Sequence, residues 1–313
     1  MKNTLCALAA LALAPVPALM AGTTTVDKNP KNPIETIKES CITGDLGVNF
    51  VTQYVSRGVV LENQGVIGQP YADLYFKLYE GDGFLNKVSL NLGLWSSIHS
   101  RGTDSGAING GHPGGTRDWY EFDYTVGLAM TFAKNWTFTP SFYAFLSPND
   151  GFSDFYGINL NLAYNDAPLW GDSGFALNPS VTVLFEVQNK AGTGADEGVY
   201  YEIALNPSKT FGPVTISLPL KAGFGSDDFY GSLNPSTGTI QDESFGYFSA
   251  GLNIAYPLKF IPECFGAWTL NANATFYYLG DGTSDFNTAP RGGAVREAND
   301  TEWVFGGGLA ITF

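Results

Sequence analysis

Residues 302–313 read EWVFGGGLAITF and close the sequence as a strictly alternating row. One face carries Trp303, Phe305, Gly307, Leu309, Ile311 and Phe313. The other face carries Val304, Gly306, Gly308, Ala310 and Thr312, which are small more than polar. A period of two is the pattern of a β-strand whose two faces meet different surroundings. The stretch therefore predicts a final strand with large side chains on one side and small ones on the other.

The same alternation recurs along the chain from residue 45 onward. VSLNLGLW (88–95) and WYEFDYTVGLAMTF (119–132) separate large apolar residues from Ser, Asn, Thr, Gly and acidic residues. Such runs predict twelve strands, near 46–60, 69–80, 87–98, 119–132, 136–146, 155–165, 177–188, 199–206, 214–224, 245–256, 268–279 and 302–313. Pro140 and Pro219 fall inside two of them, where we expect bulges or strand ends because proline cannot donate to the ladder.

The connections between these strands alternate in length. The stretches 133–135 and 206–213 are short, whereas 100–117, 225–244 and 280–300 are long, polar and rich in glycine. Short turns at one end and long loops at the other are typical of outer-membrane barrels. The sequence therefore predicts an all-β fold: a transmembrane antiparallel up-and-down β-barrel of about twelve strands, with short periplasmic turns and long extracellular loops.

Charged residues are confined to one face of the predicted strands. A cation at the midplane of a barrel's lipid-facing surface costs about 2–4 kcal/mol, so charges are expected to point into the lumen. The predicted lumen charges are Arg57, Asp73, Lys77, Glu121, Asp123, Glu186, Glu202 and Lys221. They are consistent with a constriction that selects solutes and equally with an ion-pair network that satisfies buried charge. Tyr71, Tyr75, Tyr143 and Tyr277 are predicted to point inward too, either to stack on solutes or to fill a narrow barrel.

The first residues predict export. Lys2 precedes the apolar run LCALAALALAPVPAL (5–19), and small residues follow, which is the pattern of a secretory signal peptide over residues 1–21. We expect a periplasmic N-terminal arm over 22–44 and a barrel over 45–313. The net charge of −14 argues against nucleic acid as a partner.

Few residues offer chemistry beyond the lumen. Cys41 and Cys264 remain after signal cleavage, and an exported protein with two cysteines predicts a disulfide between them. The acidic pairs at 227–228 and 242–243 suit a divalent cation or, more simply, a solvated loop. The only histidines are His99 and His112, and a serine nucleophile would have to use His99 with Ser97 or Ser100. We therefore expect no enzyme activity, no metal and no cofactor.

The first third of the predicted barrel resembles an uncharacterised family of bacterial outer-membrane barrels, porin-like in kind. The matching residues are Tyr54, Arg57, Gly58, Gln69, Gly93, Trp95, Ser97, Glu121, Asp123 and Tyr124, which form Tyr-x-x-Arg-Gly, Gly-x-Trp-x-Ser and Glu-x-Asp-Tyr motifs. The resemblance implies the outer membrane of a Gram-negative bacterium. Phe313 is similar to the C-terminal aromatic residue by which such barrels are recognised for assembly, which implies the barrel assembly machinery, membrane lipid and lipopolysaccharide as partners.

Two functions are compatible with these features. The first is a small passive channel for polar solutes through a lumen lined by Asn, Thr, Tyr and the charges above. The second is a non-conducting structural or adhesive barrel that uses its long extracellular loops.

Overall fold

The computed structural model describes residues 40–102, 115–226, 228–234, 239–288 and 299–313. The predicted signal peptide and most of the predicted arm lie outside these residues, as do His112 and Asp227. The strands are β1 (Ile42–Val51), β2 (Tyr54–Ser56), β3 (Val59–Glu62), β4 (Ile67–Glu80), β5 (Leu85–His99), β6 (Asp118–Phe132), β7 (Trp136–Leu146), β8 (Phe155–Tyr164), β9 (Phe175–Ala176), β10 (Ser180–Gln188), β11 (Val199–Leu205), β12 (Ser208–Phe211), β13 (Val214–Ser217), β14 (Leu220–Gly225), β15 (Tyr230–Asn234), β16 (Thr239–Glu243), β17 (Phe245–Pro257), β18 (Ala267–Leu279) and β19 (Thr301–Thr312). The helices are η1 (Ala167–Ser173), η2 (Glu263–Phe265) and α1 (Asp281–Thr288).

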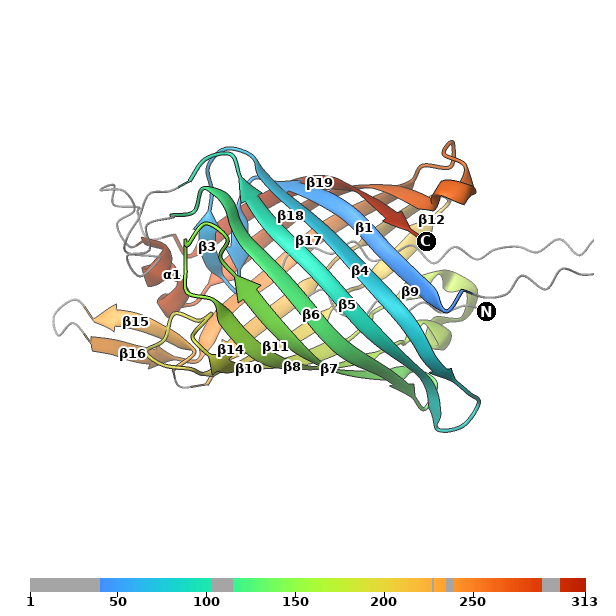
Figure 1. The fold of residues 1–313 in the computed structure, drawn as a ribbon, viewed down its shortest axis with the longest axis horizontal. Helices are drawn as coiled ribbons and strands as arrows, with labels where there is room; N and C mark the ends of the chain where they lie inside the picture. The colour runs from blue at the N-terminus through green and yellow to red at the C-terminus, as the bar shows by residue number, and fades with distance from the viewer. Residues whose placement is uncertain (1–39, 103–114, 227, 235–238, 289–298) are drawn as a thin grey trace, which may run out of the picture.

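Twelve of the strands form a closed antiparallel barrel, as the alternation predicts (Figure 1). Their order around the wall is β1, β4, β5, β6, β7, β8, β10, β11, β14, β17, β18 and β19, and β1 pairs with β19 to close the circle. Each wall strand neighbours the next one along the chain, so the topology is up-and-down. Among the residues that the structure describes, no helix is both long enough and apolar enough to cross a bilayer.

The two ends of the barrel differ. At the end that holds the start of β1 and Phe313, which we call the turn end, the connections include 81–84 and 133–135 and the small elements η1, β9, β12, β13 and η2. The opposite end, which we call the loop end, carries α1 and the β15–β16 hairpin, which projects beyond the wall (Figure 1).

The outer face of the barrel is apolar, as predicted. Register pairs place Val126 beside Leu92 and Phe142, and Leu46 beside Ala72 and Ile311, all on this face. Along the twelve described wall strands, the positions in register with these carry no Asp, Glu, Lys or Arg. Large side chains stay exposed here, including Trp303 and Phe305 of the closing stretch. Such an uncharged belt is what a transmembrane barrel presents to lipid.

The first predicted strand, 46–60, is wrong. The wall strand β1 runs from Ile42 to Val51, so the barrel begins at 42 instead of 45, and residues 54–62 leave the wall as a separate hairpin of β2 and β3. The reason is a two-residue turn: Arg57 and Gly58 have φ of 48° and 87°, and Ser56 pairs with Val59 across them. Positive φ at both central residues belongs to the type I′ turns that join tight hairpins.

The two prolines are accommodated differently. Pro219 ends a strand, because the predicted strand 214–224 is divided into β13 and β14 on either side of Leu218 and Pro219. Pro140 sits inside an unbroken β7, where the expectation of a bulge or strand end is wrong. The β6–β7 register is the same on both sides of it, from Met130↔Phe138 to Gly127↔Ser141, and only the bridges between these two are missing. The strand therefore tolerates proline by leaving two residue pairs of the β6–β7 ladder unformed.

Candidate functional site

The hairpin over Tyr54–Glu62, called the lumen hairpin from here, folds inside the loop end of the barrel. Its tip reaches elements far from β1: the Tyr230 hydroxyl donates to the carbonyl of Arg57 at 3.0 Å, and the Asn287 amide donates to the carbonyl of Gly58 at 2.9 Å. The Val60 N–H donates back to Asn287 Oδ1 at 2.8 Å. The hairpin is therefore anchored to α1, which lies between β18 and β19, and to β15, which follows β14.

Two apolar clusters fill the space around the lumen hairpin. One contains Tyr143, Phe145, Phe155, Leu184, Tyr200, Phe229, Tyr230, Tyr247 and Leu279. The other contains Val51, Tyr54, Val55, Val60, Ile67, Tyr120 and Val304. Their wall residues all belong to the loop-end halves of their strands. The loop-end half of the lumen is thus narrowed by packed side chains, which the sequence alternation did not predict.

Arg57 stands at the tip of the lumen hairpin and points into the narrowed region. Its guanidinium carbon lies 5.5 Å from the ring centroids of both Phe145 and Tyr200. These are cation–π distances, and the planar guanidinium suits such stacking. The side chain is 9 % exposed, and no carboxylate of the described residues lies within ion-pair distance of it.

Glu121 and Asp123 lie beside Arg57 on the inner face of β6. Both are buried, they hydrogen-bond each other, and both interact electrostatically with Arg57. The Tyr54 hydroxyl donates to Glu121 Oε2 at 2.8 Å. Burial first, and then the nearby carboxylates, raise the pKa of Tyr54 well above its usual value, so its phenol remains a donor. The structure thus brings together three of the predicted lumen charges.

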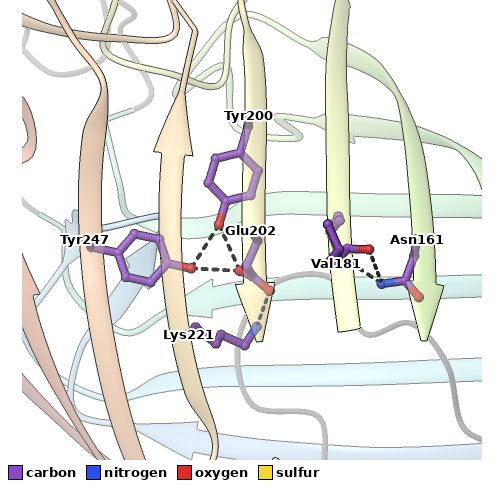
Figure 2. Close-up of polar contacts among 7 residues, drawn as sticks. Asn161, Val181, Tyr200, Glu202, Lys221 and Tyr247 are labelled. Atoms are coloured by element: carbon purple, nitrogen blue, oxygen red, sulfur yellow. Dashed lines mark hydrogen bonds and ion pairs between the residues drawn. The ribbon is translucent and has the colours of Figure 1, made fainter. Parts of the chain in front are cut away.

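Glu202 and Lys221 form a second polar group on the inner faces of β11 and β14 (Figure 2). Lys221 Nζ lies 3.1 Å from Glu202 Oε1, while the hydroxyls of Tyr200 and Tyr247 each donate to Glu202 Oε2 at 2.8 Å. The two hydroxyls are themselves 3.0 Å apart. Glu202 is therefore fully engaged, which fits the network interpretation better than a free selectivity charge.

The remaining predicted lumen charges are Glu186, Lys77 and Asp73. Glu186 accepts backbone N–H bonds from Ala191, Gly192 and Gly198 at 2.5, 2.9 and 2.7 Å, so it holds the loop between β10 and β11. Lys77 pairs with Glu80 at 2.7 Å at the turn end. Asp73 lies on the inner face of β4, in register with Asp45.

The four predicted inward tyrosines do point inward. Tyr143 belongs to the first apolar cluster, and Tyr277 packs against both clusters, so these two fill the barrel. Tyr71 lies over Gly47, where an added Cβ would meet its ring at 2.6 Å. Tyr71 and Tyr75 are half-buried on the inner face of β4. These last two are therefore better placed than the first two to meet a solute.

The turn-end half of the lumen is lined by polar side chains. Several of their buried atoms have no protein partner, namely Asn253 Oδ1, Asn271 Nδ2, Asn273 Oδ1 and Thr139 Oγ1. They come from β7, β17 and β18. Buried polar groups are nearly always hydrogen-bonded, to water where protein does not supply a partner. We therefore expect water to hydrogen-bond these polar groups in the turn-end half of the lumen.

The predicted disulfide is wrong: Cys41 and Cys264 are free thiols and both are exposed. Cys41 precedes β1 and Cys264 precedes β18, at the same end of the barrel, but β19 lies between these two strands.

Ser97 and His99 form a buried pair near the loop end. Ser97 Oγ lies 2.7 Å from His99 Nε2, His99 Nδ1 contacts the Thr116 carbonyl, and the Thr116 hydroxyl donates to Glu62. Ser97 and His99 are 0 % and 1 % exposed, so no substrate reaches the hydroxyl in this conformation. The chain of contacts ties β5 to the lumen hairpin.

Two further features concern the ends of the barrel. Phe313 closes the last ladder, because its N–H and carbonyl bond to Gly44 at 3.0 and 2.9 Å, and its side chain is exposed. In the predicted acidic loop, the Asp228 N–H donates to Asp242 Oδ1 at 3.3 Å. Within the described part of the chain, no three His, Cys, Asp or Glu residues are grouped to hold a metal ion.

Comparisons with known proteins give structural likeness only. No family model matches the sequence, and no curated protein matches it. An outer-membrane channel from Pseudomonas putida F1 is 12 % identical with a TM-score of 0.47, over 90 % of this chain and 99 % of that one. The NanC porin is 10 % identical with a TM-score of 0.43, over 86 % and 100 %. The transport unit of the autotransporter AIDA-I from Escherichia coli is 10 % identical with a TM-score of 0.38, over 90 % and 92 %.

Proposed function

We propose that this protein is a passive outer-membrane channel for small polar solutes, whose lumen is narrowed by the lumen hairpin. The observation that carries the proposal is the contrast between the two faces of the wall. The outer face is uncharged, whereas the inner face holds buried polar atoms that have no protein partner and suit water or a polar solute. A wet interior inside a lipid-facing cylinder is the physical requirement for solute diffusion.

The constriction lies at the tip of the lumen hairpin. Arg57, Glu121 and Asp123 lie near one another there, in the packed loop-end half of the lumen. Charged groups at the narrowest point of a pore select solutes by charge and hydrogen bonding. Solutes would pass between this tip and the wall, so the hairpin sets the size limit.

The location and the partners follow from the same proposal. The turn end faces the periplasm and the loop end faces outward, as short turns and long loops do in outer-membrane barrels. Residues 1–21 would be removed on export, and lipid with lipopolysaccharide would surround the belt. Phe313, exposed at the end of β19, would be read by the barrel assembly machinery. We propose no catalytic role for Ser97 and His99, because both are buried.

One observation favours the second candidate, a non-conducting structural or adhesive barrel. The two apolar clusters and the lumen hairpin occupy the loop-end half of the lumen, and the β15–β16 hairpin extends past the wall as a surface for contacts. In that case the hairpin would be a permanent plug.

Liposome swelling separates the two candidates. Proteoliposomes with the wild-type chain should swell slowly in small polar solutes such as glycerol or arabinose, and a variant with residues 54–62 replaced by a Gly-Ser linker should swell faster. Swelling by the variant alone would favour the plugged barrel. Liposomes that swell with neither protein, although both are inserted and heat-modifiable on gels, would contradict the channel.

A further inference from the structure

We propose that the constriction holds a binding site for small zwitterionic solutes of the α-amino acid type, with the solute carboxylate on Arg57 and its ammonium group on Asp123. The proposal rests on the proposed channel function for the solute's path to the site. It adds a class of ligand and the two residues that recognise its charges.

Arg57 supplies the first half of the site. Its guanidinium is stacked against Phe145 and Tyr200, which fixes its position, yet no residue that the structure describes accepts a hydrogen bond from its N–H groups. Burying a charge without hydrogen-bond partners is costly, so the fork of donors needs an acceptor from the lumen. A carboxylate matches this fork in a bidentate manner.

Asp123 supplies the second half. Its Oδ1 atom is buried and has no hydrogen-bond partner, while the carboxyl group also bonds to Glu121. Asp123 and Phe145 are register partners on β6 and β7, and the Arg57 guanidinium lies over the Phe145 ring. An unsatisfied acceptor and an unsatisfied donor group therefore face the same small region of the lumen, too far apart for a direct ion pair.

Charge decides which ligand suits this region. A simple anion would gain Arg57 but would be repelled by Glu186 and by the Glu121–Asp123 pair, which carries one negative charge because a hydrogen bond between two carboxyl groups requires a shared proton. A simple cation could bind Asp123 but would be repelled by Arg57. An α-amino acid carries its carboxylate and ammonium group two bonds apart, so one molecule can satisfy both sites without a net charge. Its side chain would rest against the aromatic rings of the first cluster.

The test is solute-induced block of ionic current through single channels in planar bilayers with KCl. L-alanine should interrupt the current at lower concentration than three matched solutes: lactate, which lacks the ammonium group, alaninamide, which lacks the carboxylate, and lactamide, which lacks both charges. Arg57→Gln and Asp123→Asn should each raise the half-blocking concentration of alanine by about ten-fold or more, as expected for loss of a charged hydrogen bond. Arg57→Lys should lie between Arg57→Gln and the wild type, because the charge remains and the fork is lost.

Lys77→Gln is the matched control, since it removes the same charge at the exposed turn end and should leave the block unchanged. Equal block by alanine and lactamide, or a block that survives both Arg57→Gln and Asp123→Asn, would overturn the site. If the wild type carries no KCl current, the channel function fails instead. Calorimetric titration of alanine into the detergent-solubilised protein then decides the site alone: saturable heat lost in Arg57→Gln supports it, and no heat refutes it.

Discussion

A single charge placed on either face of β6 should reveal which face meets lipid. Val126 is exposed near the middle of this strand and is flanked by the outward residues Leu92 and Phe142, whereas its neighbour Thr125 points into the lumen beside Gly93. A lysine at the bilayer midplane of a barrel's lipid face costs about 2–4 kcal/mol. Val126→Lys should therefore lower the free energy of unfolding by that amount.

Thr125→Lys is the matched variant and should cost well under half as much, because its ammonium group would enter the polar lumen near Asp73 and Asp123. Both values would come from reversible guanidinium unfolding in lipid vesicles, followed by tryptophan fluorescence. A penalty of similar size at both positions, or a larger one at Thr125, would refute the assignment of the two faces.

Three further results are expected. Asn287→Ala removes two of the three hydrogen bonds described above that anchor the lumen hairpin, and each buried group left unpaired costs about 1–3 kcal/mol. Trypsin should therefore cleave the variant after Arg57 faster than the wild type, and equal rates would contradict the anchor. Burial alone would raise the pKa of Asp166, but hydrogen bonds from the Trp170 indole and from backbone N–H groups outweigh burial and lower this pKa below its usual value of 3.8. The ionised Asp166 therefore stabilises the fold above about pH 4, and this stability is lost as the pH falls through the folded-state pKa. The melting temperature of wild type should drop across that range more than that of Asp166→Asn, and parallel curves would count against this assignment. Cys41 and Cys264 should both react with maleimide in the folded protein without reductant, and a mass two hydrogens short of the dithiol would show that they pair after all.

The barrel could be predicted from the sequence because lipid requires every wall strand to carry apolar side chains on its outer face. A strand with Trp303 and Phe305 outward and Gly306 and Gly308 inward shows this pattern locally, and its repetition gives the strand number. The lumen hairpin was not predicted because Val59 and Val60 extend the apolar, strand-like sequence beyond the turn. The Arg-Gly pair was the available indication of a tight turn, and positive φ at both residues is what reverses the chain there into a hairpin.

The site could be predicted only as a set of inward charges. Alternation places Glu121 and Glu202 on the inner face, but it does not predict that Tyr54 binds Glu121 or that Lys221 pairs with Glu202. Pairing across a barrel depends on how far each side chain reaches over the lumen, and on segments such as Phe229–Tyr230 that enter from a loop. These contacts are tertiary, and no local period encodes them.

Single-channel recording in planar bilayers tests the central claim most directly. The wild-type chain should give discrete, small conductance steps in KCl, and the variant with residues 54–62 replaced by a Gly-Ser linker should give larger steps, because the lumen hairpin narrows a continuous aqueous path. Membranes that stay silent with both proteins, despite verified insertion, would show that no such path exists.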